Sequence, residues 1–253
     1  MISKMFRITL GIVLASFAIS SAAWAAGSNA PCSNASLSGT YGFLHDGTDS
    51  NGAPATAAVT QITFDSTTGT FSGDTTASHD GVIATESLTG TYTVASNCTG
   101  TGTPAGGSPF SIVVTSTGFL AVHPFSEGFA LKQGSPTCTN AGVKGSFAFE
   151  TTGLFLAGAP ATGWVAFIGE LKLSGDGVIS GHIAGSEDST ILTFAEEPVT
   201  GTYSVNSDCR GWATITPKGR HEMHFHLVVV DGGNEILVVE TDADTVVSGT
   251  LQR

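Results

Sequence analysis

Two stretches, Gly90-Thr-Tyr-Thr-Val-Ala-Ser-Asn-Cys98 and Gly201-Thr-Tyr-Ser-Val-Asn-Ser-Asp-Cys209, repeat one pattern at an offset of 111 residues (201 − 90). A second pair of stretches, Cys32–Phe43 and Cys138–Phe149, repeats at an offset of 106 residues (138 − 32). The order is the same in both halves, and small loop insertions would produce the drift in offset. Because this period is far longer than a solenoid repeat, the sequence predicts a tandem duplication of one small domain.

The duplication divides the chain into a first unit at 26–133 and a second unit at 138–253. The stretch Gln133-Gly-Ser-Pro-Thr137 between them has the Gly and Pro content of a short linker. We therefore expect each unit to fold around its own core.

Residues 1–25 have the pattern of a secretory signal peptide. Lys4 and Arg7 precede an apolar stretch at 8–19, and Ala23-Trp24-Ala25 provides the small residues of a cleavage site. The sequence therefore predicts a secreted or periplasmic protein. No later stretch reaches the roughly 20 apolar residues of a membrane-spanning helix, so we expect no membrane span in the mature chain.

Four cysteines allow three pairings in an oxidising compartment. Each unit carries one cysteine before its first predicted strand and one after its Gly-Thr-Tyr strand. The repeat therefore favours one bridge within each unit, Cys32–Cys98 and Cys138–Cys209. The rival interpretation, a zinc site, would be expected to show a C-x-x-C spacing, which the sequence lacks.

Short alternating stretches predict an all-β fold. In the second unit they fall at 143–149, 164–173, 178–183, 201–205, 212–215, 223–230, 235–239 and 246–251. Turn signals such as Ser174-Gly-Asp-Gly177 and Asp231-Gly-Gly-Asn234 separate them. About eight short strands joined by tight hairpins favour an antiparallel up-and-down barrel in each unit. The alternative is a pair of β-sandwiches.

Composition excludes several classes of function. Lys and Arg total 9 against 21 Asp and Glu, which gives a formal net charge of −12. This acidity disfavours nucleic-acid binding, which needs a basic surface. The sequence also lacks a G-x-S-x-G elbow, and two disulfides would leave no free thiol as a nucleophile, so we predict a non-catalytic protein.

The first strands carry a loose family resemblance. Gly39 and Tyr41, and likewise Gly145 and Phe147, place an aromatic residue two positions after a glycine. This spacing resembles that of calycin-type barrels, the group of the avidins and lipocalins, and is similar to barrels of the allene oxide cyclase type. The Gly-Thr-Tyr-x-Val-x-x-x-Cys-x-Gly pattern at 90–100 and 201–211 more closely resembles uncharacterised exported bacterial proteins. The calycin resemblance implies a small ligand in a barrel mouth, and no particular activity.

The segment His221-Glu-Met-His-Phe-His226 is a candidate metal site. On a strand, Glu222, His224 and His226 would share one face. Two imidazoles and a carboxylate suit a divalent transition metal such as zinc, copper or iron. The alternative is a solvated polar face with no cofactor. The first unit has Pro109 and Ser111 at the positions matching His224 and His226, so a metal site would belong to the second unit alone.

Aromatic residues of the second unit are candidate ligand-wall residues. Trp164 and Trp212 have no counterparts in the first unit, whereas Tyr203 and Phe149 repeat Tyr92 and Phe43. Core packing is the competing interpretation, because aromatic side chains dominate the energetics of small cores. Acidic pairs such as Glu196-Glu197 and Asp242-x-Asp244 are predicted to be solvated turn residues.

Three functions stay open from the sequence. The first is an exported, non-catalytic barrel protein that binds a small apolar ligand. The second is a structural or surface-interaction protein of the cell envelope. The third, suggested by resemblance alone, is an isomerase or cyclase with a barrel pocket. A barrel cavity above roughly 300 Å³ would favour binding.

Overall fold

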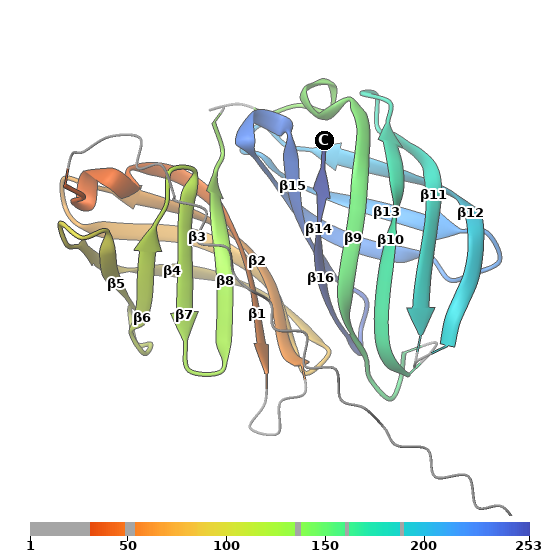
Figure 1. The fold of residues 1–253 in the computed structure, drawn as a ribbon, viewed down its shortest axis with the longest axis horizontal. Helices are drawn as coiled ribbons and strands as arrows, with labels where there is room; N and C mark the ends of the chain where they lie inside the picture. The colour runs from red at the N-terminus through yellow and green to blue at the C-terminus, as the bar shows by residue number, and fades with distance from the viewer. Residues whose placement is uncertain (1–30, 49–53, 135–137, 160–161, 188–189) are drawn as a thin grey trace, which may run out of the picture. The chain divides into compact units, whose positions relative to one another are not determined.

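The computed structural model describes residues 31–48, 54–134, 138–159, 162–187 and 190–253 (Figure 1). The predicted signal peptide and part of the predicted linker lie outside these residues. Residues 31–253 form one compact unit. Within the described residues, no helix is long and apolar enough to cross a membrane.

The described strands form two closed antiparallel barrels of eight strands each (Figure 1). The predicted tandem pair of barrels is therefore confirmed, and the sandwich alternative is wrong. The first barrel consists of β1 (Gly39–Thr48), β2 (Pro54–Asp65), β3 (Thr70–His79), β4 (Val82–Val94), β5 (Thr99–Pro104), β6 (Phe110–Val114), β7 (Gly118–His123) and β8 (Ser126–Lys132). The second consists of β9 (Gly145–Phe155), β10 (Gly163–Leu173), β11 (Val178–Glu187), β12 (Thr190–Val205), β13 (Arg210–Pro217), β14 (Met223–Val230), β15 (Glu235–Glu240) and β16 (Thr245–Gln252).

A short 3-10 helix precedes each barrel and closes one end of it. These helices are η1 (Asn34–Leu37) and η2 (Asn140–Val143), and a third, η3 (Asp231–Gly233), lies between β14 and β15. The stretch at 143–149 is predicted as a strand from its first residue, but Val143 belongs to η2 and β9 begins at Gly145. The backbone turns there because Gly145 has φ +152°, and Gly39 of the first barrel has φ +101°. These are conformations that residues with a Cβ rarely adopt.

The repeated residues make the same contacts in both barrels. The side chain of Asn34 accepts a hydrogen bond from the backbone N–H of Val94, and Asn140 does so from Val205. The hydroxyl groups of Tyr92 and Tyr203 donate to the backbone carbonyls of the same two asparagines. These repeated asparagine and tyrosine side chains therefore hold each 3-10 helix against its barrel.

Both disulfides form within their own barrels, as predicted. Cys32 bonds to Cys98 and Cys138 bonds to Cys209. The bridges join the segment before each 3-10 helix to the β4–β5 turn and the β12–β13 turn. They therefore add a covalent tie to the closed ends.

Aromatic and aliphatic side chains fill the barrel interiors near these closed ends. In the first barrel Phe64 makes edge-to-face contacts with Tyr41, Tyr92 and Phe119. In the second barrel only about 20 Å³ of space remains among core residues that include Phe149, Phe225 and Ile236. The centre of the second barrel is therefore a packed core.

A third apolar cluster joins the outer faces of the two barrels. Leu44, Ala57 and Val59 of β1 and β2 pack with aliphatic side chains of β14, β15 and β16. Polar contacts also join the two barrels, and His226 and Ser248 each make one of them. Nδ1 of His226 lies 2.8 Å from Oγ1 of Thr76, and the hydroxyl of Ser248 donates to Asp46 over 2.6 Å.

Candidate functional site

The open end of the second barrel holds a cavity of about 790 Å³. This volume falls in the range of small-molecule sites, roughly 300–1,000 Å³. The cavity lies opposite the disulfide, where β9, β12 and β15 contribute inward-facing residues and the β13–β14 and β15–β16 turns form the rim. It is lined by Phe155, Phe167, Glu197, Pro217, Lys218, Gly219, Arg220, His221, Glu222, Met223, Glu240, Asp242 and Thr245.

Glu240 places a carboxyl group inside this mouth. On β15 it follows Ile236 and Val238 at alternate positions, both of which are buried in the core of the second barrel, so its side chain points inward. Glu240 is only 2% exposed, and its Oε2 atom has no hydrogen-bond partner among the described residues. A buried carboxyl oxygen without a partner costs free energy, so the group calls for a functional explanation.

Burial, together with the charge of Asp242 and a hydrogen bond with its side chain, raises the pKa of Glu240 to about 8. Glu240 is therefore mostly protonated at neutral pH. The carboxyl group is hydrogen-bonded to Asp242, whereas its Oε2 atom has no such partner among the described residues. A strongly shifted carboxyl in a cavity is typical of functional sites.

Glu197 supplies a second carboxyl oxygen to the same space. It lies on β12, and its Oε2 atom is buried without a hydrogen-bond partner among the described residues. Nε of Arg220 lies 3.9 Å from this atom, within ion-pair range but beyond a hydrogen bond. The prediction of a solvated turn residue is therefore wrong for Glu197, because β12 extends from Thr190 to Val205.

Asp242 connects the mouth to the outer surface of the barrel. Its carboxylate accepts hydrogen bonds from the backbone N–H of His224 over 2.9 Å and lies 2.7 Å from Nδ1 of the same residue. The hydrogen bond to Asp242 is the largest of the effects that raise the pKa of His224. Nε2 of His224 lies 3.2 Å from Glu222. The four side chains thus form one network from Glu240 to the outer face of β14.

His224 and His226 lie on the outer face of β14 and Glu222 directly precedes this strand, but the three predicted metal ligands do not converge. His224 is paired with Asp242 and Glu222, whereas His226 contacts Thr76 of the first barrel. In the part of the chain that the structure describes, no group of three or more His, Cys, Asp and Glu side chains is arranged to hold a metal ion. A metal at Glu222 and His224 stays a prediction.

The predicted ligand-wall residues fall into two sets. Trp164 and Trp212 lie on the outer surface of the wall, 58% and 46% exposed. Phe149 and Tyr203 are buried in the core, and the Tyr203 hydroxyl is engaged at the closed end by Asn140 and Gly175. None of the four lines the mouth; the apolar walls there are Phe155, Phe167 and Met223.

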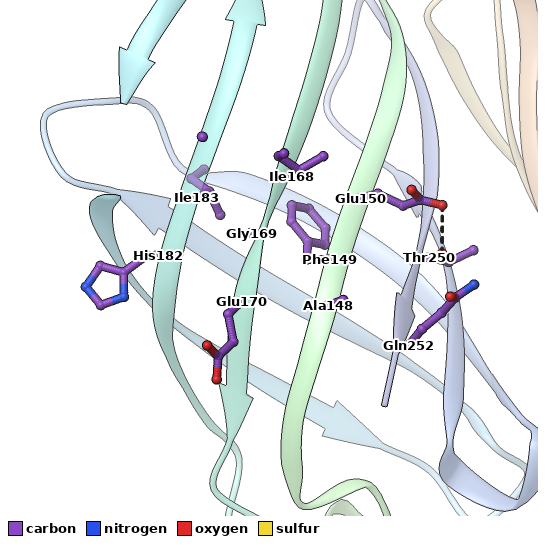
Figure 2. Close-up of a pocket in the computed structure, with 11 residues that line it drawn as sticks. Ala148, Phe149, Glu150, Ile168, Gly169, Glu170, His182, Ile183, Thr250 and Gln252 are labelled. Carbon is purple, nitrogen blue, oxygen red and sulfur yellow. Dashed lines mark hydrogen bonds between the residues drawn. The ribbon is translucent and has the colours of Figure 1, made fainter. Parts of the chain in front are cut away.

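A second hollow, of about 590 Å³, lies on the outer face of β9, β10 and β11 (Figure 2). Figure 2 shows Glu170 and His182 on neighbouring strands, and Glu150 in contact with Thr250. Its lining contains none of the buried polar atoms that lack a partner among the described residues. The mouth is therefore the better candidate for a binding site.

The open end of the first barrel is smaller and differently lined. Its cavity of about 290 Å³ is bordered by Phe43, His45, Phe110 and His123, among others. Burial lowers the pKa of His45 to about 4, and the neighbouring His79 acts in the same direction. His45 is therefore neutral at pH 7, and the duplicated barrels have diverged at their open ends.

Comparisons of the chain with known proteins identify no family for it. No protein-family model matches the chain. No curated protein matches it either.

Proposed function

We propose that this protein is an exported binding protein whose second barrel holds a small ligand in its open mouth. The observation that carries the proposal is the pair of buried carboxyl oxygens, on Glu197 and Glu240, that have no hydrogen-bond partner among the described residues and lie at a cavity of about 790 Å³. Polar groups that converge in a partly apolar cavity are typical of ligand sites. The two disulfides and the signal pattern at 1–25 support export.

The sequence alone suggests an apolar ligand. The ligand of this proposal also carries polar groups. Phe155, Phe167 and Met223 offer apolar contact, whereas the carboxyl groups offer hydrogen-bond acceptors. Because the barrel centre is packed, the ligand occupies the mouth and does not reach the closed end.

A neutral environment-sensitive dye such as Nile red tests the location. We expect Phe155→Ala to weaken dye binding severalfold, because it removes one wall of the mouth. Phe125→Ala is the matched control, since Phe125 is 69% exposed on the first barrel. A flat titration, or equal loss in both variants, would contradict the proposal. Recovery of bound molecules chemically unchanged separates binding from the isomerase or cyclase alternative.

The surface-interaction alternative has one observation in its favour. Val113, Leu120 and Val122 are 47–55% exposed on the neighbouring strands β6 and β7, where Val113 pairs with Leu120. Exposed apolar side chains that lie together mark interaction surfaces more often than isolated ones do. Loss of binding to the cell-envelope fraction in Leu120→Ser, with dye binding intact, would support this second function.

A further inference from the structure

The buried hydrogen-bond acceptors of the mouth determine which chemical groups a ligand needs. Oε2 of Glu240 and Oε2 of Glu197 are buried carboxyl oxygens that have no hydrogen-bond partner among the described residues. The Glu240 side chain is already hydrogen-bonded to that of Asp242. A ligand that offers N–H donors would satisfy these atoms, whereas a ligand carboxylate would set acceptor against acceptor.

The charges around the cavity favour the same class of ligand. The mouth is lined by four acidic residues, two strong bases and one histidine: Glu197, Glu222, Glu240, Asp242, Lys218, Arg220 and His221. Lys218 lies exposed on the rim, and Arg220 is within ion-pair range of Glu197. Even with Glu240 protonated, the acids Glu197, Glu222 and Asp242 outnumber the two bases, and the whole chain carries a formal charge of −12. Such a field attracts cations.

The walls fit an apolar body next to a cation. Phe155 and Phe167 are buried aromatic residues of β9 and β10, and Met223 lies at the start of β14. Aromatic faces attract ammonium groups in addition to making apolar contact.

We propose that the mouth of the second barrel selects organic amines, with Glu240 as the residue that recognises the protonated nitrogen of a ligand with an apolar body. The inference rests on the proposed function, since it assigns a ligand class to the same mouth. Binding of the ammonium group favours the ionised form of Glu240, so the Glu240 proton leaves to solvent as the ion pair forms. Lys218 and Arg220 would instead recruit an anion if the rim decided selectivity.

Three probes of matched shape test the ligand class: 2-phenylethylamine, 2-phenylethanol and phenylacetate. Each is titrated calorimetrically at pH 7 into the disulfide-intact mature protein, in phosphate and in Tris. We expect the amine to bind at least tenfold more tightly than the alcohol and the acid. The difference between the two buffers should show release of nearly one proton per amine bound.

Two variants identify the residue responsible. Glu240→Gln keeps the shape of the side chain but cannot form the ion pair, so the amine preference and the proton release should disappear while the alcohol still binds. Glu170→Gln is the matched control on the outer face of β10 and should behave like the wild type.

Each of the other outcomes overturns one part of the amine-binding proposal. Equal or tighter binding of the alcohol or phenylacetate overturns the amine class and leaves the mouth as a binding site. An amine preference that survives Glu240→Gln overturns the role of Glu240. Failure of all three probes to bind overturns the ligand class together with the proposed function.

Discussion

A Cβ atom built on Gly42 of β1 would lie 2.5 Å from Cγ1 of Val230 on β14 and 2.8 Å from Cγ1 of Val228. The hydrogen of Gly42 therefore allows the outer faces of the two barrels to touch. Leu44, two positions along β1, packs in the same aliphatic cluster. The duplicated barrels are thus held together by a buried apolar surface as well as by the chain that links them.

Replacement of Gly42 by a larger residue should weaken this contact. We expect Gly42→Ala to lower the free energy of unfolding by about 1–3 kcal/mol, the usual cost of overpacking a well-filled core, and Gly42→Val to lower it more. Urea unfolding measures the change. Gly142→Ala is the control, because the added methyl group would meet only Oγ1 of Thr139, at 3.6 Å. Equal effects of the two alanine variants would contradict a tight contact at Gly42.

The barrels themselves could be predicted from the sequence, but the contact between them was missed. Hairpin spacing and the repeat were sufficient for two barrels, because each depends on local turns and alternation. The signal for the contact was also present. The segments 227–230 and 236–239 are apolar at every position, which indicates a strand buried on both faces. Only the partner surface, the small residues of β1 and β2, could not be identified from the sequence, because it depends on how the two barrels pack.

The candidate site was likewise only partly predictable from the sequence. Glu240 could have been found from the sequence, because it continues the alternation of Ile236 and Val238 and ends an apolar strand. Glu197 could not, since a strand of the length of β12 is not indicated by residues 190–200. The histidine cluster is the more unusual sequence, yet His224 contacts carboxylates and His226 contacts the first barrel. The sequence does not show these partners, because they depend on what packs against the outer face of the strand.

Glu240 should make stability fall as the pH rises. Its pKa is about 8 in the folded protein, against an ordinary value of 4.5 for a solvated glutamate. The folded state therefore binds more protons than the unfolded state between these values, and stability is lost progressively from about pH 4.5 to 8. His226, whose pKa burial lowers, acts in the opposite direction below pH 6.5.

The contribution of Glu240 is measured by difference. We expect Glu240→Gln to unfold at higher urea concentration than the wild type at pH 8, and the gap to close towards pH 4.5. Glu170→Gln, on the exposed outer face, should show no such pH-dependent gap. A constant gap across this range would mean that Glu240 is ionised, or equally protonated, in both states.

The disulfides should contribute similar amounts of stability. The bridges join residues 66 and 71 positions apart, and loops of this length correspond to about 4 kcal/mol in the chain-entropy model. We expect the double variants Cys32→Ser/Cys98→Ser and Cys138→Ser/Cys209→Ser to lose roughly this amount each in urea unfolding at one pH. A loss in only one of them would show that the two closed ends are not equivalent, despite their matching Asn and Tyr contacts.

The metal prediction for β14 now has fewer ligands to test. Nε2 of His224 and Oε1 of Glu222 lie 3.2 Å apart, close to the separation of two ligands that each lie about 2.1 Å from one zinc ion. Asp242 holds the other ring nitrogen of His224, the arrangement that orients metal-binding histidines. His226 is occupied with Thr76.

Calorimetric titration with zinc tests that arrangement. If zinc binds here, His224→Ala and Glu222→Gln should abolish the heat of binding, and His226→Ala should leave it intact. His182→Ala serves as the control for nonspecific imidazole binding, because His182 lies exposed on β11 (Figure 2). No heat in the wild-type protein would exclude the site. Loss of binding in His226→Ala as well would restore the three-ligand arrangement expected from the sequence and would require β14 to move away from Thr76.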